Sequence, residues 1–329
     1  MNDATVAVSA IVVNHRRRRL LASCLESLEQ ALARVEEPTE VIVVDNASDD
    51  GSRELVRDRH PAATLVPLSA NVGFPRAVNE ALGSARGEWL LLINNDATIE
   101  PDAVRQLLAV GCEAPDVGSV AAQMRFAGQP GTINSAGIEV DRLGVVYDRL
   151  LGRPISSSER EPTEVFGASA GAALFRRAML ADVGGFDDSF FAFLEDADLA
   201  WRARMTGWRS LYAPAAVVHH HHSATAGHAS GFKHFHVGLN RVRLLAKNAD
   251  GRHLARYGAA MAAYDLGYVA YACVADRTLA PVRGRLLGLR QWRSYRRTGV
   301  RRRRVALAPV RGARAALERR RAWPREPTG

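Results

Sequence analysis

Cysteine is scarce in this chain, which argues against two common ways of building a small domain. Only three of the 329 residues are cysteine (Cys24, Cys112 and Cys273), and no two of them form a CxxC pair. A disulfide framework or a cysteine-ligated zinc site needs more closely grouped cysteines. The usage is typical of a reducing cytoplasm, and the first residues lack the charged and apolar regions of a signal peptide. We therefore expect a cytoplasmic protein.

Two common nucleotide-binding motifs are also missing. The apolar, β-branched segment 6–14 is followed by NHRRRR rather than GxGxxG, and no GxxxxGK[ST] occurs in the chain. Without these glycines the backbone cannot approach a pyrophosphate closely, which argues against a dinucleotide dehydrogenase and a P-loop enzyme. A site for a diphosphate would then need a divalent metal held by a carboxylate, and Asp96 can supply one.

What the sequence does contain is a regular alternation of two patterns. Apolar, β-branched runs predict strands at 6–14, 40–46, 63–69, 88–96, 117–126 and 209–222, with a small-residue strand leading into a helix at 165–180. Helical spacing recurs at 20–35, 51–60, 74–86, 101–113 and 195–207. Segment 128–144 is expected to be turn-rich and 150–163 a polar loop. The alternation predicts an α/β fold, with a doubly wound, mostly parallel sheet covered on both faces.

Polar residues gather where the first four predicted strands end. They are Asn14, Asp45, Asn46, Asn71, Gly73, Asn94, Asn95 and Asp96. In open α/β sheets, ligands bind at the carboxyl ends of the strands. Each residue alone also fits a helix cap or an Asx-turn. Together they indicate a site large enough for a nucleotide.

The segment 186–208, FDDSFFAFLEDADLAWRARMTGW, places several acids in an aromatic run. Glu195 and Asp196 begin a predicted helix and project about 100° apart, so they cannot do the same job. One of them could take a proton from a substrate hydroxyl. Alternatively, both could simply favour the helix N-terminus through its dipole.

Six separated segments together resemble family 2 of the inverting glycosyltransferases, of the GT-A fold, and within it the bacterial rhamnosyltransferase-like branch. They are IVVNHRR, EVIVVDNASDDGS, NVGFPRAVNEAL, GEWLLLINNDATIEPDAV, GASAGAALFRRAMLADVGGFDDSFFAFLEDADLAWRARMTGW and YAPAAVVHHHHSAT. They follow the order of the family and span about 6–226. The resemblance implies a GT-A domain over 1–245, with a donor half at about 1–115 and an acceptor half at about 116–245. A helical, basic extension would cover 246–329, its last part disordered.

The resemblance also implies roles for individual residues. The donor nucleotide sugar would contact Val13, Asn14, Asp45, Asn71, Gly73, Asn79, Asn94 and Asn95. The catalytic base would be Asp196, with Glu195 as its neighbour and rival, and the acceptor side would include Phe191, Asp198, Trp201 and Arg202. Asp198 is also placed to brace the helix or to pair with Arg202. A divalent metal, Mg²⁺ or Mn²⁺, would be held by Asp96 and by His220 or His219. The metal motif often reads Asn-Pro-Asp in this branch and here reads Asn94-Asn95-Asp96, so it holds one carboxylate.

The function implied is metal-assisted transfer of a hexosyl or deoxyhexosyl group from a nucleoside-diphosphate sugar to a hydroxyl of a cell-envelope glycan or lipid-linked acceptor. Two alternatives remain open. A sugar nucleotidyltransferase shares a doubly wound sheet, but should have a Gly-rich basic loop after the first strand. A catalytically inactive glycan-binding or scaffold protein of the same fold is the other.

Lysine and acidic residues are nearly absent from the C-terminal end. Residues 283–329 hold 16 arginines, no lysine and two glutamates, whereas the first 282 residues carry 28 basic and 33 acidic side chains. Clustered arginine predicts an anionic partner, although a solubilising, partly disordered tail has the same composition. No nucleic-acid-binding module accompanies it, which argues against nucleic acid.

The segment 258–280 is apolar, but Asp265, Asp276 and Arg277 make it a poor membrane span. An amphipathic helix that packs on the domain or lies in the membrane interface fits better. The following RGRLLGLRQWRSYRRTGVRRRR mixes arginine with Leu, Trp and Tyr, which suits an anionic membrane surface. We therefore expect a peripheral protein on the inner face of the plasma membrane, attached through 283–329.

Overall fold

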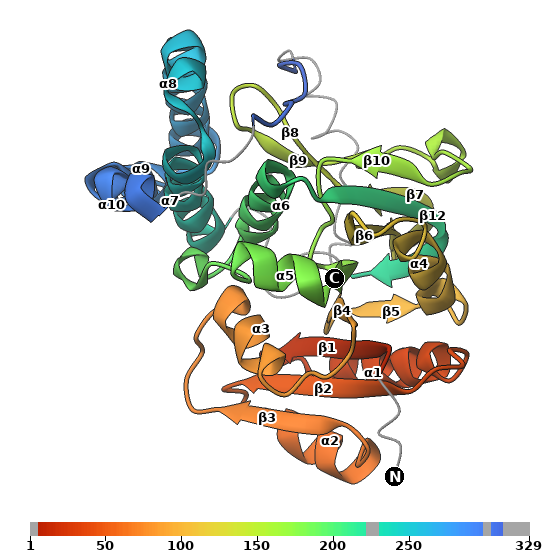
Figure 1. Ribbon diagram of the computed structural model, residues 1–329. Helices are drawn as coiled ribbons and strands as arrows, with labels where there is room; N and C mark the ends of the chain where they lie inside the picture. Colours follow the sequence, from red (N-terminus) through yellow and green to blue (C-terminus); the bar gives the residue numbers. More distant parts are fainter. Residues whose placement is uncertain (1–5, 222–229, 299–303, 312–329) are drawn as a thin grey trace.

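The computed structural model describes residues 6–221, 230–298 and 304–311. A ten-stranded sheet runs through its centre (Figure 1). Four strands of the N-terminal part, in the order β4-β1-β2-β3, are parallel neighbours: β1 (Val8–Asn14), β2 (Thr39–Asn46), β3 (Thr64–Leu68) and β4 (Trp89–Asn94). The expected α/β fold with a mostly parallel sheet is therefore confirmed.

Burial on both faces explains why the first strand is mostly apolar. In β1, Val8, Ala10 and Val12 belong to one hydrophobic cluster, which includes α1 (Arg18–Leu32). Ile11 points to the opposite cluster, which includes α3 (Phe74–Leu82). Successive side chains of a strand alternate between its faces, so a strand buried on both faces reads as a continuous apolar run. The remaining helices of this part are α2 (Ser52–Arg59) and α4 (Ala103–Gly111).

The second half extends the same sheet with mixed strand directions. β11 (Ala172–Arg176) is antiparallel to β4, and β6 (Val117–Phe126) is antiparallel to β11. β12 (Arg209–His220) is parallel to β6, and β10 (Thr163–Val165) pairs with β12 at the edge. β5 (Ala97–Ile99) also pairs with β12, which brings the end of β12 beside the residues that follow β4.

Two segments expected to be irregular contain regular structure. Segment 128–144 holds β7 (Gln129–Ser135) and β8 (Ile138–Val140), which pairs with β9 (Val146–Asp148). Segment 150–163 holds a 3-10 turn, η1 (Ile155–Ser157), and the first residue of β10. Most of these elements have only three residues, too few to show an alternating pattern. β7 is exposed over its first three residues, which explains its polar sequence.

The remaining elements of the described chain are helical. α5 (Arg177–Val183), η2 (Asp188–Phe190) and α6 (Glu195–Thr206) lie between β11 and β12. α7 (Gly231–Asn248), α8 (Gly251–Ala275), α9 (Ala280–Arg290) and α10 (Trp292–Thr298) form a helical group on one side, with α8 extending away from the sheet (Figure 1). α9 packs closely on α7: a side chain at Gly284 would lie 2.1 Å from the carbonyl oxygen of Phe235. α7 runs through the expected domain boundary at 245–246, and that division stays a prediction.

Candidate active site

A cavity of about 600 Å³ opens at the carboxyl ends of β1, β2 and β4. It is bounded on the other side by the residues that precede and begin α6, and by α7 and α8. Eleven of the residues singled out from the sequence line it: Val13, Asn46, Asn71, Gly73, Asn94, Asn95, Asp96, Phe191, Glu195, Asp196 and His220. The fold thus brings together in one cavity segments that are up to about 200 residues apart in the chain.

A small amide network shapes the wall at the end of β2. The Asn46 side-chain amide donates to Asn71 Oδ1 (3.1 Å) and to the Gly73 carbonyl (3.2 Å), and Asn46 Oδ1 accepts from Val72 N (2.9 Å). Gly73 has a φ of 85°, and a side chain there would lie 2.5 Å from the carbonyl oxygen of Phe191. Glycine is therefore required here by both conformation and space.

Asn14 and Asp45 lie beneath this wall instead of lining the cavity. Asp45 is 1% exposed, and its Oδ2 is 2.5 Å from Arg53 Nε. Asn14 is fully buried; it donates to Asp45 Oδ1 (3.4 Å) and accepts from Asn95 Nδ2 (2.7 Å). In this structure the Asp45 carboxylate is held by Arg53, so a direct contact with a nucleotide would need rearrangement. Asn79 is also engaged elsewhere, because its amide donates to the Phe186 carbonyl and to Asp188.

His220 and Asp96 face each other across the end of β12. His220 Nε2 lies 3.0 Å from Asp96 Oδ1, and both residues are buried. The other ring nitrogen, Nδ1, is 3.0 Å from Asn134 Oδ1 and would donate to it, which leaves Nε2 directed at the carboxylate. One carboxylate oxygen and one imidazole nitrogen form a donor set suited to a divalent metal.

His219 points elsewhere. Its Nε2 lies 3.1 Å from Glu100 Oε1 and it does not line the cavity. Neighbouring residues of a strand face opposite sides, so only one of the two can face Asp96. The geometry favours His220. His222, which shares its predicted face, lies outside the described residues. No group of three or more His, Cys, Asp and Glu side chains in the described chain is arranged to hold a metal without further ligands.

Glu195 and Asp196 occupy different environments at the start of α6. Burial, reinforced by the neighbouring Asp196 carboxylate, raises the pKa of Glu195 to about 8. Its Oε2 is buried without a hydrogen-bond partner among the described residues. Burial and the charge of Asp148 raise the pKa of Asp196 to about 6, opposed by backbone N–H donors that include Ala197 (2.8 Å). Backbone N–H donors favour the charged form of Asp196, so Asp196 ionises more readily than Glu195.

The residues immediately before α6 have an unusual backbone. Phe191, Phe193 and Leu194 have φ values of 56°, 69° and 68°, a region that non-glycine residues seldom adopt. Neighbouring elements hold them there. The Phe191 carbonyl accepts from Phe74 N (2.7 Å), and the Asn240 amide of α7 donates to the carbonyls of Phe190, Ala192 and Phe193. Strain of this kind is retained when the surroundings fix it, and here it lies directly before the two acids.

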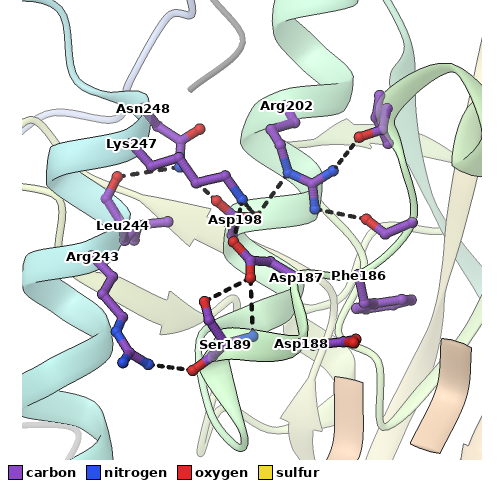
Figure 2. A network of polar contacts seen from close by, with 12 residues as sticks. Phe186, Asp187, Asp188, Ser189, Asp198, Arg202, Arg243, Leu244, Lys247 and Asn248 are labelled. Carbon is purple, nitrogen blue, oxygen red and sulfur yellow. Dashed lines mark hydrogen bonds and ion pairs between the residues drawn. The ribbon is translucent and has the colours of Figure 1, made fainter. Parts of the chain in front are cut away.

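Asp198, Trp201 and Arg202 were expected on the acceptor side, and they lie behind the cavity wall. Trp201 packs edge-on against Phe166 in a buried cluster. Asp198 is fully buried and accepts from Arg202 Nε (2.8 Å), as the sequence also suggested, and from Lys247 and Asn248 of α7 (Figure 2). Arg202 donates onward to the carbonyls of Val183 and Gly185. These side chains support the cavity without reaching it.

Sequence reasoning missed several cavity residues. They include His15, Met124, Asn134, Tyr147, Asp148, Phe193, Phe232, Lys233 and Tyr268. Lys233 and Tyr268 belong to α7 and α8, where no strand end or motif marked them.

A sequence model of the family described as Glycosyl transferase family 2 matches residues 9–184 of this chain. The chain belongs to that family. Among its relatives, the N-acetylglucosaminyl-diphospho-decaprenol L-rhamnosyltransferase of Mycobacterium tuberculosis is 31% identical over 214 residues, which cover 58% of this chain and 69% of the relative. The resemblance to the rhamnosyltransferase-like branch is thereby confirmed.

Solved structures of similar architecture support the GT-A fold for this family 2 chain. The mannosyltransferase PcManGT from Pyrobaculum calidifontis, in complex with GDP-Man and Mn²⁺, superimposes with a TM-score of 0.55 at 21% identity, covering 90% of this chain and 86% of that one. GalNAc-T7 with UDP, GalNAc and Mn²⁺ gives a TM-score of 0.59 at 13% identity, covering 75% of this chain and 48% of that one. At these identities the likeness concerns the fold alone.

Proposed function

We propose that this family 2 glycosyltransferase moves a sugar from a nucleoside-diphosphate sugar to an acceptor hydroxyl, with inversion at the anomeric carbon. The observation that carries the proposal is the position of Asp196, which lines the same cavity as the Asp96–His220 pair. A base and an anion-stabilising group belong at opposite ends of such a reaction, one at the incoming hydroxyl and one at the leaving diphosphate.

The donor would lie against the ends of β1, β2 and β4. Asn71, Gly73 and Val13 form that wall, and Asn94 and Asn95 lead to Asp96. Asp96 and His220 would hold Mg²⁺ or Mn²⁺, leaving the other coordination positions to diphosphate and water oxygens. When bound, the metal supplies positive charge that stabilises the departing diphosphate. The Mn²⁺ named with PcManGT and GalNAc-T7 supports this expectation.

Asp196 would act as the base. Its carboxylate takes the proton of the acceptor hydroxyl while the hydroxyl oxygen forms a bond to the anomeric carbon. The bond from that carbon to the diphosphate oxygen breaks, and the nucleoside diphosphate leaves with the electron pair. Attack from the side opposite the leaving group inverts the configuration. The pKa of about 6 suits a base that is ionised at neutral pH yet can still accept a proton.

The rhamnosyltransferase relative suggests the substrate class. Its name describes transfer of L-rhamnose to a diphospho-decaprenol-linked N-acetylglucosamine. By that likeness we propose a deoxyhexosyl or hexosyl donor and a lipid-linked or cell-envelope glycan acceptor. A sugar nucleotidyltransferase fits less well, because β1 is followed by NHRRRR without glycine. An inactive binding protein would not require Asp96, His220 and Asp196 to share a cavity.

We also propose that the protein works at the inner face of the plasma membrane. Within the described residues, no helix combines the length and apolarity needed to cross a membrane. Part of the arginine-rich end, 299–303 and 312–329, lies outside the described residues. Removing 299–329 spares α7–α10, and it should lower binding to anionic vesicles.

The test of the activity is a panel of nucleotide sugars with Mg²⁺ or Mn²⁺, read by thermal shift and by slow donor hydrolysis. We expect one donor to raise the melting temperature in a metal-dependent way and to be hydrolysed slowly without acceptor. If no nucleotide sugar protects the protein, the proposed function is wrong.

A further inference from the structure

The helix α8 is unusually exposed for its length. Of its 25 residues only Met261 and Ala272 are buried. From 259 to 275, every exposed position is Ala, Gly, Leu, Tyr or Val, and Leu266 and Val274 are 71% and 81% exposed. At 1.5 Å per residue this charge-free surface is about 25 Å long. We call it the α8 apolar face. An exposed apolar surface of this extent usually marks a site of interaction with a protein or a membrane.

The single acid within this stretch is turned away from the face and is neutralised. Asp265 Oδ1 accepts from Arg241 of α7 (2.7 Å) and from Arg285 of α9 (2.8 and 2.9 Å). The helix therefore has two distinct sides. Its polar contacts are made with α7 and α9, and its apolar side chains face solvent. That distribution is the reverse of what an isolated surface helix of a soluble domain shows.

The charges around the face are of one sign. The exposed charged residues of the described segment 251–296 are all arginine: Arg252, Arg256, Arg277, Arg283, Arg290 and Arg293. No acidic residue of that segment is exposed. Arg252 and Arg256 stand at one end of the face and Arg277 at the other. In α9, Leu286 and Leu289 are more than half exposed between Arg283 and Arg290.

We propose that the α8 apolar face docks on an anionic lipid bilayer, with its apolar side chains in the interface and the surrounding arginines on lipid phosphates. An apolar stripe with a cationic border is the composition of helices that lie in a membrane surface. A second copy of the chain is a poorer occupant, because a symmetric contact through this face would bring two arginine borders together without acids between them.

The other side of the same helix reaches the candidate active site. Tyr268 lines the cavity, and its hydroxyl lies 2.9 Å from His234 Nδ1 at the start of α7. Docking through α8 would therefore set the cavity beside the bilayer. An acceptor with a lipid anchor would reach Asp196 without leaving the membrane. This last step rests on the proposed function, whereas the docking itself does not.

The test uses the full chain and two exposed positions. Leu266→Glu with Val274→Glu places two charges on the face without touching the core. Ile155→Glu, at a 39% exposed position on η1 outside the helical group, is the matched control. Binding is measured by co-sedimentation with phosphatidylcholine vesicles, with and without 30% phosphatidylglycerol. Thermal unfolding and the donor-induced thermal shift are measured without vesicles.

We expect the unmodified chain and the control to bind phosphatidylglycerol vesicles at least tenfold more strongly than phosphatidylcholine vesicles, and less at high salt. The double variant should lose at least tenfold of that binding while unfolding and donor binding stay unchanged. Equal binding by the double variant would overturn the proposal, as would equal binding to the two lipids. A dimer in size-exclusion chromatography that the double variant dissolves would assign the face to a second copy. If none of the three proteins binds a donor, the proposed function is wrong. The vesicle result still decides whether the α8 apolar face docks on lipid.

Discussion

Lys247 of α7 donates to Asp198 of α6 at 2.8 Å, and neither side chain is more than 6% exposed. The same ammonium group lies 2.7 Å from Asp187 Oδ2, in the loop before η2 (Figure 2). One buried cation thus joins the first turn of α6, the loop that leads to it and α7. Since Glu195 and Asp196 stand in that same turn, the position of the proposed base depends on a helix that lies outside the sheet.

Replacing Lys247 by methionine should strongly destabilise the protein. The change keeps most of the side-chain volume but leaves the buried Asp198 with fewer partners and Asp187 without its ion pair. Removing one member of a buried pair costs about 3–5 kcal/mol. Urea unfolding measures the loss. Arg105→Met, which breaks an exposed pair with Asp102, is the control and should cost about 0–1 kcal/mol. Equal losses in the two variants would mean that burial of the pair is unimportant.

Asn240→Ala should impair transfer more than it impairs donor binding. The Asn240 amide holds three carbonyls of the strained segment before Glu195, at 2.7 to 2.9 Å. Without it we expect a stability loss of about 1–3 kcal/mol from unpaired groups. We also expect a lower kcat with a nearly unchanged donor-induced thermal shift, because Asn240 does not line the cavity. A variant that loses stability alone, with normal kcat, would show that the segment keeps its shape unaided.

The parts of this site that sequence could predict are those fixed by the parallel sheet. Asn71, Gly73 and Asp96 follow strands whose carboxyl ends meet at one edge, so strand assignment alone placed them together. Asp45 follows the same rule, yet it lies beneath the wall because Arg53 holds it, and such pairing depends on tertiary contacts. Lys233 and Tyr268 reach the cavity from helices whose packing no local pattern reveals. β5, β8, β9 and β10 were missed because three residues show no periodicity.

His220→Gln should weaken metal-dependent donor binding, whereas His219→Gln should not. His220 Nε2 faces Asp96 within the cavity, and His219 faces Glu100 outside it. We expect the first variant to lose most of the extra thermal shift that Mn²⁺ gives with a nucleotide sugar. The two substitutions are chemically identical and adjacent, so each controls for the other. The reverse pattern would move the metal site to His219.

Asp196→Asn should abolish transfer while donor binding stays largely intact, and Glu195→Gln should be tolerated. Asparagine cannot accept the proton of the acceptor hydroxyl. Glutamine, however, mimics the neutral form, which burial favours for Glu195. We expect at least a 100-fold loss of kcat for the first variant, from removal of a general base, and less than about tenfold for the second. Both are measured by single-donor transfer assays. If Glu195→Gln is the inactive variant, the base has been assigned to the wrong residue.

Activity and stability should respond to pH in opposite directions. The proposed mechanism requires the ionised form of Asp196, so kcat should fall as the pH drops through about 6. Stability behaves differently, because the pKa values of Glu195 and Asp196 are raised by folding. The folded state then binds more protons than the unfolded state between about pH 4 and 8. The stability that these groups contribute is complete below the unfolded pKa values and is lost as the pH rises through the folded ones.

The variant Glu195→Gln lacks the contribution of Glu195 to this pH dependence. The stability of the variant relative to the unmodified protein should therefore rise by at least about 1 kcal/mol between pH 5 and 9, since each pKa unit corresponds to about 1.4 kcal/mol. Urea unfolding at several pH values tests this, and a difference that does not vary with pH would show that Glu195 titrates normally.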